Sequence, residues 1–316
     1  GGGTPSVFSG EQLCRIMDEI KQVFILSEDA EITMEANPGT VSLEQLKLCH
    51  EAGINRISFG LQSTVQQELD MLGRIHTYEE FLQSYHWARK AGFSNINVDL
   101  MFAIPGQTCE NWKHNLETIA ELSPEHISAY SLIIEEGTPF AQKKLILPTE
   151  DEEYQMYEDT AEILRKYGFH QYEISNYARD GFECRHNKGY WQRTEYLGAG
   201  LGAASLFQGK RFSNTRDMQT YLADSTEPEK IREDVTALSR NNEIEEFMFL
   251  GLRMTEGISE RQFERNFGCR IEDIYGSVLA KYKEMDLLEH TGEFWRFTRK
   301  GIHVSNPILA DFLLDE

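Results

Sequence analysis

Three polar residues that could bind a ligand or carry a proton stand at the ends of predicted strands. Glu35 lies in EITMEANPG, Gln62 in INRISFGLQS and Asp99 in FSNINVDLMFAIPGQ. Each precedes glycine, proline or serine residues that mark the start of a loop. A single residue of this kind is more often a solvated loop residue. Because three recur at the same end of consecutive strands, we predict that they share one ligand site.

A glycine-rich run at the start of the sequence could complete such a site. It reads Gly1-Gly2-Gly3-Thr4-Pro5-Ser6. Glycines let the backbone turn with positive φ and approach a bound group closely, so free N–H and C=O groups become available to a small polar ligand. The run is not a phosphate-binding P-loop, because no Gly-Lys-Ser/Thr follows it. An ordinary turn or a tag remnant remains the alternative interpretation.

The elements that position these residues alternate regularly between strand and helix. Strands are predicted at 31–35, 54–61, 96–102 and 126–134, and helices at 9–25, 42–53, 77–92, 109–122 and 149–168. Short connections between them are typical of βαβ units, which form a parallel sheet covered by helices. We therefore predict an α/β fold, a partial (β/α) barrel whose functional groups lie at the carboxyl ends of the strands.

The remainder of the chain has a different character. Residues 170–216 are aromatic and glycine-rich without clear periodicity, which we interpret as a folded segment of the functional face rather than a helix. The polar run DSTEPEKIREDVTALSRNNE is interpreted as a linker and an exposed helix. Helices at 244–254, 259–268 and 271–285 and a hairpin turning at Thr291-Gly292 then predict a winged-helix-like module. The predicted domains are 1–216 and 217–316.

Composition limits the possible partners. The 316 residues carry a net charge of −21, which argues against broad binding of nucleic acid and favours a lid or docking role for the winged-helix-like module. No apolar run reaches the roughly 18 residues of a membrane span, and no signal peptide is visible. The five cysteines are widely spaced, so we expect free thiols and a cytoplasmic location.

Several motifs together resemble one family. They are GGGTPS, MEANPG, FGLQS, DMLGR, NVDLMFAIPGQ, YSLIIEEGTPF, SNYARDGFECRHNKGYW and YLGAG. The combination resembles radical SAM proteins related to oxygen-independent coproporphyrinogen III oxidase, and most closely their heme-chaperone branch. The resemblance spans nearly the whole chain. It implies a partial (β/α) barrel, a [4Fe–4S] cluster, S-adenosylmethionine and heme.

The resemblance also implies a pocket for S-adenosylmethionine. Gly2, Gly3 and Thr4 would hold its methionine end. The residues that would complete the pocket are Glu35, Gln62, Arg74 and Asp99. Their chemistry suits the ligand, because carboxylates accept from ammonium and hydroxyl groups and a guanidinium can pair with a carboxylate through two hydrogen bonds. A surface ion pair is the alternative role for Arg74.

A second group of residues is linked to heme in the family. In the heme-chaperone branch this segment is His-Asn-x-x-Tyr-Trp, and here it comprises His186, Asn187, Tyr190 and Trp191. An imidazole is a common axial ligand of heme iron, and aromatic rings can cover a porphyrin face. The alternative is that His186 is a hydrogen-bonded core histidine and Trp191 a core aromatic residue.

One departure from the family concerns the cluster. Family members carry Cys-x-x-x-Cys-x-x-Cys before the GGGTPS loop, and this motif is absent from the sequence. The five cysteines present do not reproduce its spacing, so we assign no cluster ligand and no catalytic residue. We expect an N-terminal truncation, an incomplete barrel with an exposed strand edge, and no radical chemistry from this chain alone.

Three functions remain open on the sequence. The preferred one is a heme chaperone that hands heme to acceptor proteins and binds S-adenosylmethionine as its small-molecule cofactor. The second is an oxygen-independent coproporphyrinogen III oxidase, which decarboxylates two propionates to vinyl groups. The third is a cofactor-binding (β/α) protein with no porphyrin role. The complete His-Asn-x-x-Tyr-Trp segment favours the first.

Overall fold

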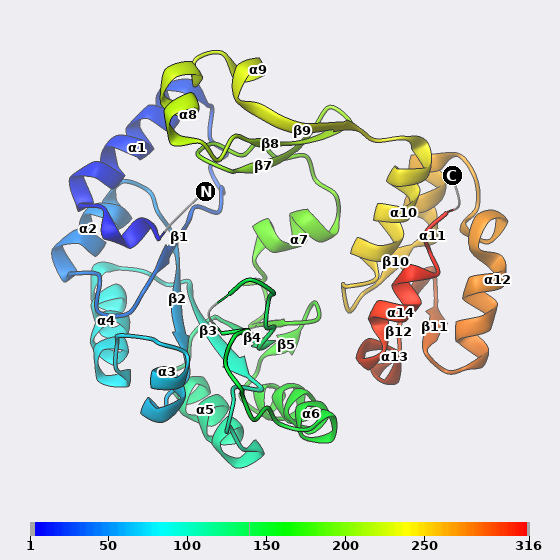
Figure 1. Cartoon of the computed structure of the whole chain (residues 1–316), viewed down its shortest axis with the longest axis horizontal. Helices are drawn as coiled ribbons and strands as arrows, with labels where there is room; N and C mark the ends of the chain where they lie inside the picture. The colour runs from blue at the N-terminus through cyan, green and yellow to red at the C-terminus, as the bar shows by residue number, and fades with distance from the viewer. Residues whose placement is uncertain (1–3, 139, 315–316) are drawn as a thin grey trace. The chain divides into compact units, whose positions relative to one another are not determined.

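The computed structural model describes residues 4–138 and 140–314, which fall into two compact units, 4–184 and 185–314 (Figure 1). Each unit has its own helices and strands. The domain boundary predicted after residue 216 stays a prediction.

The unit 4–184 is built on one mixed sheet with the strand order β1-β2-β3-β4-β6-β5. The parallel strands are β1 (Thr33–Ala36), β2 (Arg56–Gln62), β3 (Ile96–Phe102) and β4 (His126–Ser131), and β6 (Asn176–Ala178) and β5 (His170–Gln171) continue the sheet in antiparallel pairing. The helical segments are η1 (Pro5–Val7), α1 (Gly10–Val23), α2 (Leu43–Glu51), α3 (Gln66–Met71), α4 (Tyr78–Ala91), α5 (Cys109–Glu121) and α6 (Glu150–Lys166). The predicted α/β class with a parallel sheet and outer helices is confirmed.

Local capping explains why the helices begin where the sequence predicts. Capping boxes, in which the N-cap side chain and the side chain three residues later bond each other's backbone N–H, start α1, α2, α4 and α6. Gly92 ends α4 with φ 108°, a left-handed conformation that glycine adopts without strain. These capping signals lie within a few residues of each helix end, so the sequence alone predicts where these helices begin and end.

The two faces of the sheet differ in polarity, and this difference positions the site. One face carries buried apolar residues such as Ile57, Val98 and Ile127, which pack against the outer helices. Alternate residues point to the opposite face, because successive side chains of a strand alternate. On that face, Ser58, Asn97 and His126 occupy paired positions of β2, β3 and β4. The fold therefore lines one side of its sheet with polar groups.

The unit 185–314 begins with α7 (Arg185–Trp191) and a three-stranded antiparallel sheet. Its strands are β7 (Ala204–Phe207), β8 (Lys210–Asn214) and β9 (Arg232–Ala237), and the helices α8 (Met218–Asp224) and α9 (Pro228–Ile231) connect β8 to β9. Two expectations were wrong here. Residues 185–191 form a helix although the segment lacks apolar periodicity, and residues 232–237 form a strand rather than part of a linker and helix. In both segments, contacts with residues distant in sequence determine the conformation more than the local propensity for helix or strand does.

The C-terminal part of this unit has the predicted winged-helix-like order. Its elements are α10 (Arg240–Gly251), β10 (Ile258–Ser259), α11 (Glu260–Phe267), α12 (Ile271–Glu284), β11 (Leu288–Thr291), β12 (Phe294–Phe297), α13 (Arg299–His303) and α14 (Ser305–Ala310). The strands form a sheet of order β10-β12-β11, and the hairpin turns at Gly292 with φ 67°. Buried residues such as Phe263, Tyr275 and Phe312 form its separate core.

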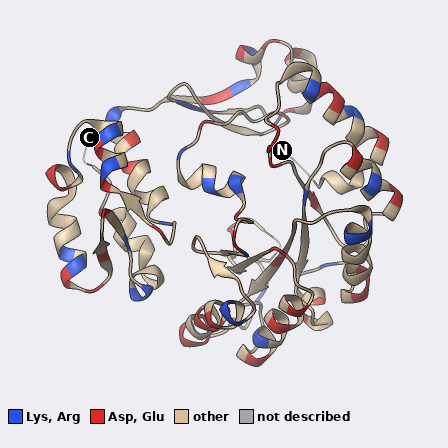
Figure 2. Ribbon diagram, turned by 180° about the vertical axis from the view of Figure 1, so that it is seen from behind, with Lys and Arg blue, Asp and Glu red and all other residues tan. Residues whose placement is uncertain are grey.

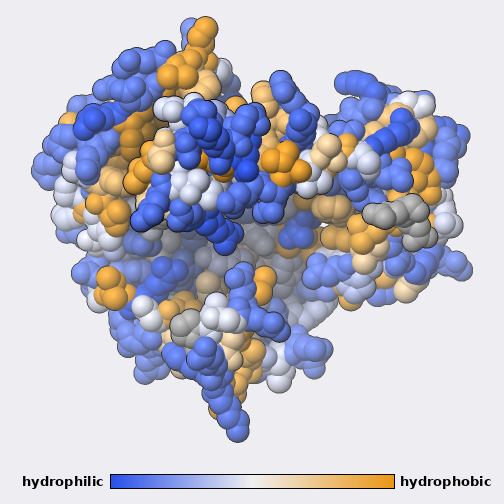
Figure 3. Space-filling view, turned by 45° about the horizontal axis from the view of Figure 1, so that its top comes forward, coloured by the Kyte–Doolittle hydropathy of each residue, from blue (hydrophilic) through white to orange (hydrophobic). Residues whose placement is uncertain are grey.

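Charged residues occur along the outer helices (Figure 2). Acidic residues gather on several of them, including the first turn of α6 (Figure 2). The face shown in Figure 3 is mostly hydrophilic, with hydrophobic side chains in small separate groups. Among the described helices, none combines the length and the apolar character needed to cross a membrane.

Candidate functional site

Tyr130 of β4 lies at the centre of the polar residues predicted from the sequence. Its hydroxyl donates a hydrogen bond of 2.7 Å to Oε1 of Gln62. Burial and then the nearby charge of Asp99 raise the pKa of Tyr130 to about 12, and the charges of Arg74 and Glu35 also act on it. Tyr130 therefore contacts Gln62 and lies close enough to Asp99, Arg74 and Glu35 for their charges to act on it.

Gln62 has an unusual backbone. Its φ is 76°, and the register between β2 and β3 shifts between Phe59 and Gln62. A positive φ is uncommon for a residue with a side chain, and such conformations cluster at functional sites. The irregular strand end directs the buried Gln62 side chain to Tyr130.

Asp99 is a half-buried residue in the same region. Its carboxylate accepts hydrogen bonds from Asn97 at 2.7 Å and from Ser58 at 3.2 Å. Burial raises the pKa of Asp99, while these hydrogen bonds and the charge of Arg56 oppose the rise. The carboxylate is therefore held in place by its polar neighbours.

The end of β1 and the loop before η1 meet beside Gln62. Glu35 is exposed, and Asn37 donates a hydrogen bond of 3.3 Å to the hydroxyl of Thr4. A Cβ atom placed on Gly60 would lie 3.3 Å from the amide nitrogen of Gln62 and 3.4 Å from the amide oxygen of Asn37. Gly60 thus keeps a small space open between two amides, which suits a flat polar ligand.

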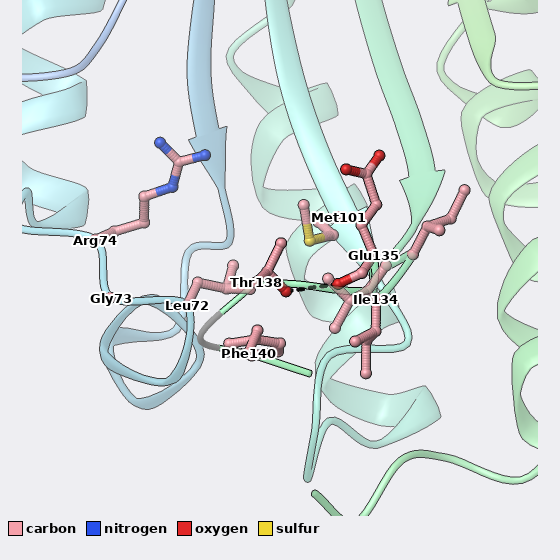
Figure 4. Close-up of a pocket in the computed structure, with 10 residues that line it drawn as sticks. Leu72, Gly73, Arg74, Met101, Ile134, Glu135, Thr138 and Phe140 are labelled. Carbon is pink, nitrogen blue, oxygen red and sulfur yellow. Dashed lines mark hydrogen bonds between the residues drawn. The ribbon is translucent and has the colours of Figure 1, made fainter. Parts of the chain in front are cut away.

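Arg74 approaches from the loop after α3 and lines a cavity of about 420 Å³ (Figure 4). Its guanidinium and the carboxylate of Glu135 reach the cavity from opposite sides. The remaining lining is largely apolar and comprises Leu72, Met101, Leu132, Ile133, Ile134 and Phe140, with Gly73 and Thr138. A guanidinium above apolar walls can pair with the carboxylate of a bound molecule.

Tyr130 is thus bonded to Gln62 and lies within electrostatic range of Glu35, Arg74 and Asp99, while Thr4 is hydrogen-bonded to Asn37 after β1. Gly2 and Gly3 lie outside the described residues. Their binding roles, and that of Thr4, stay predictions.

His186 and Tyr190 are both exposed on α7 in the unit 185–314. Their rings meet edge to face with centroids 4.5 Å apart, and Tyr190 contacts Tyr196 in the same way at 4.7 Å. Asn187, between them, is half-buried. His186 is thus not a core histidine, and its position on the surface suits a ligand of heme iron.

Trp191 has different surroundings from His186. The guanidinium of Arg253 lies 4.8 Å from its ring centroid, and its indole N–H is buried without a hydrogen-bond partner. The ring lines a small cavity together with Phe247, Gly251 and Phe294. This packing joins α7 to the C-terminal helices, as a core aromatic residue would.

Comparison with known proteins identifies the family. Residues 1–119 match the radical SAM superfamily, and residues 238–304 match the HemN C-terminal domain. The heme chaperone HemW of Lactococcus lactis is 40% identical over 100% of this chain and 84% of its own length. HemW of Escherichia coli is 33% identical over 100% of this chain and 83% of its own length.

The chain belongs to the HemW family of radical SAM proteins.

The fold agrees with this assignment. Coproporphyrinogen III oxidase (HemN) of Escherichia coli, a radical SAM enzyme, superposes with a TM-score of 0.86 over 99% of this chain and 76% of its own. The identity is 23%, so this likeness concerns the fold. A mitochondrial radical S-adenosyl methionine domain-containing protein 1 of Danio rerio is 34% identical over 100% of this chain and 74% of its own length.

The described residues offer no obvious site for a metal cluster. No group of three or more histidine, cysteine, aspartate or glutamate side chains in the described part of the chain could hold a metal ion. None of the five cysteines, all of which lie among the described residues, forms a disulfide bond. The described residues therefore do not fit a [4Fe–4S] cluster.

Sequence reasoning missed Tyr130 and Asn37. Tyr130 follows His126 and Ser128 at a spacing of two in β4, which was a signal that all three share a face. Asn37 precedes Pro38-Gly39, a pattern that indicates a turn and carries no signal of its contact with Thr4.

Proposed function

We propose that this protein is a heme chaperone of the radical SAM class, which binds heme and transfers it to acceptor hemoproteins. The proposal rests on the exposed His186–Tyr190 pair of α7. It is supported by relatives named heme chaperones, which are 33 to 40% identical over almost the whole chain. His186 would ligate the iron, and Tyr190 would lie against the porphyrin edge.

We further propose that the site around Tyr130 binds S-adenosylmethionine. The residues that would hold it are Gly2, Gly3, Thr4, Glu35, Gln62, Arg74 and Asp99. The fit is supported by the space at Gly60, the half-buried Asp99 and the guanidinium of Arg74. S-adenosylmethionine, once bound beside a reduced cluster, supplies radical chemistry in this superfamily. This chain's own residues orient the ligand and neutralise its carboxylate.

We place the protein in the cytoplasm, where a reducing environment agrees with five cysteines that form no disulfide bond. Its partners would be heme-accepting proteins.

A heme titration followed by the Soret band tests the heme proposal. We expect one heme per chain for the wild type and a dissociation constant at least about tenfold higher for His186→Ala, because the iron loses its axial ligand. His86→Ala is the matched control, since His86 is another exposed helical histidine. Equal binding by His186→Ala and wild type would place the ligand elsewhere. No saturable shift in the wild type would refute the chaperone proposal, and consumption of coproporphyrinogen by a protein that also carries the cysteine motif of the family would then favour the oxidase.

Gly60→Ala tests the S-adenosylmethionine site. The added methyl group would occupy the space between Gln62 and Asn37, so we expect the dissociation constant of S-adenosylhomocysteine to rise about tenfold. The folded chain should tolerate the change, because its closest contact is the flexible end of Gln62. Gly276→Ala in α12 is the control, where the nearest atom is 3.8 Å away. Unchanged affinity of Gly60→Ala in calorimetric titration would argue against this site.

A further inference from the structure

A chain of buried hydrogen bonds leads from Tyr172 to Asp99. The Tyr172 hydroxyl lies 2.8 Å from Nε2 of His126, and Nδ1 of His126 lies 2.6 Å from the amide oxygen of Asn97. The amide nitrogen of Asn97 then donates to Oδ1 of Asp99 at 2.7 Å. Tyr172, His126 and Asn97 are each no more than 5% exposed, so water does not compete for these bonds.

The direction of donation is fixed along this chain. When Asp99 is ionised its carboxylate can only accept, so the amide nitrogen of Asn97 faces Asp99 and its oxygen faces His126. His126 must then carry its proton on Nδ1. In a neutral imidazole the other nitrogen accepts, and the Tyr172 hydroxyl therefore donates to Nε2. Every donor points towards Asp99.

The charged and titratable groups around the chain are compatible with a neutral imidazole. Burial first, and then the charge of Arg56, hold the pKa of His126 well below its usual range. Burial also raises the pKa of the Tyr172 hydroxyl, with further contributions from Cys184 and Glu173. Tyr172 thus keeps its proton and His126 gains no second one at neutral pH.

We propose that Tyr172, His126 and Asn97 form a relay of aligned hydrogen bonds that positions the carboxylate of Asp99 for its ligand. They are positioning residues, because they act through Asp99. Asn97 fixes Oδ1, while Ser58 donates to Oδ2 at 3.2 Å. These bonds restrain the carboxylate, and a hydroxyl or ammonium group of the ligand would donate to its remaining lone pairs. This inference rests on the proposed S-adenosylmethionine site.

Calorimetric titration with S-adenosylhomocysteine tests the relay. Tyr172→Phe removes the terminal donor, and we expect the dissociation constant to rise about three- to tenfold. Asn97→Asp keeps the shape but cannot donate to Asp99, so we expect a rise of about tenfold or more. Tyr85→Phe is the matched control, because the Tyr85 hydroxyl is also buried but donates to the backbone of Leu122. A nitrogen-15 spectrum of the histidines should show His126 protonated on Nδ1.

The outcomes separate the relay from the site itself. Weaker binding in both relay variants, with Tyr85→Phe unchanged, supports the relay. Unchanged binding in both, while Asp99→Asn binds poorly, overturns the relay alone. A His126 protonated on Nε2 also overturns it, and this measurement does not depend on how well a variant folds. Normal binding by Asp99→Asn overturns the proposed site as well.

Discussion

At the scale of the residue, the buried carboxylate of Asp99 lowers the free energy of unfolding. A role in ligand binding would explain why the chain carries it. Burial raises the pKa of Asp99 above its ordinary value of 3.8, which means that the folded chain holds this proton more tightly than the unfolded chain does. The resulting penalty appears as the pH rises above 3.8 and is complete above the folded pKa. Asp99 should therefore lower stability at neutral pH in the absence of ligand.

Asp99→Asn tests whether the buried carboxylate lowers the stability of the folded chain. An amide keeps the shape and removes the buried charge, so we expect the melting temperature at pH 8 to rise by about 2–4 °C. The gain should shrink as the pH approaches 4, because the native carboxyl then also becomes neutral. Thermal melts across this pH range measure it.

The exposed Asp18→Asn serves as the control for the same charge change. It should leave the melting temperature unchanged. A lower melting temperature for Asp99→Asn at pH 8 would contradict the predicted penalty.

At the scale of the element, one glutamate connects three parts of the unit 185–314. Glu246 of α10 accepts from Arg193, which follows α7, at 3.0 Å and from Arg211 of β8 at 2.7 Å. Burial alone raises the pKa of Glu246, but the hydrogen bonds and charges of the two arginines lower it overall. The ion pairs of Glu246 thus help to hold Arg193, and with it the end of α7, the helix that carries His186.

Glu246→Gln should lower the free energy of unfolding by about 2 kcal/mol at pH 7, because it leaves two partly buried guanidinium groups without their counter-charge. A depressed pKa gives stability that is present above the ordinary value of 4.5 and is lost as the pH falls through the folded pKa. The difference between variant and wild type should therefore shrink below pH 4.5. Denaturant unfolding at several pH values checks this.

Glu243→Gln is the matched control on the same helix. Glu243 is 40% exposed and lies 3.8 Å from Arg193, so its loss should change stability by less than about 0.5 kcal/mol. Equal effects of the two substitutions would contradict the special role of Glu246.

At the scale of the whole molecule, the winged-helix-like order of elements suggests DNA as a partner. The net negative charge of the chain argues against it. The chain carries 52 acidic and 31 basic residues, and duplex DNA is recognised chiefly through its phosphates. We expect no saturable binding of a 20-base-pair duplex at 50 mM salt up to about 50 µM protein. Fluorescence anisotropy measures it, and binding that weakens with added salt would contradict the prediction.

The sequence by itself determined the α/β class, the order of the outer helices and the winged-helix-like module. It could do so because capping boxes and strand alternation act within a few residues. It also identified Glu35, Gln62 and Asp99 as neighbours, since consecutive parallel strands end at one edge. The motifs it contained led to the family that the comparisons confirmed.

Only the tertiary structure decided which partners these residues meet. Tyr130 joins them through the register of β3 and β4, and Gln62 reaches it through a positive φ at an irregular strand end. Likewise α7 and β9 exist because of contacts distant in sequence, such as Trp191 with Arg253 and β9 with β8. A local pattern cannot encode such contacts, because their free energy depends on chain segments that meet only after folding.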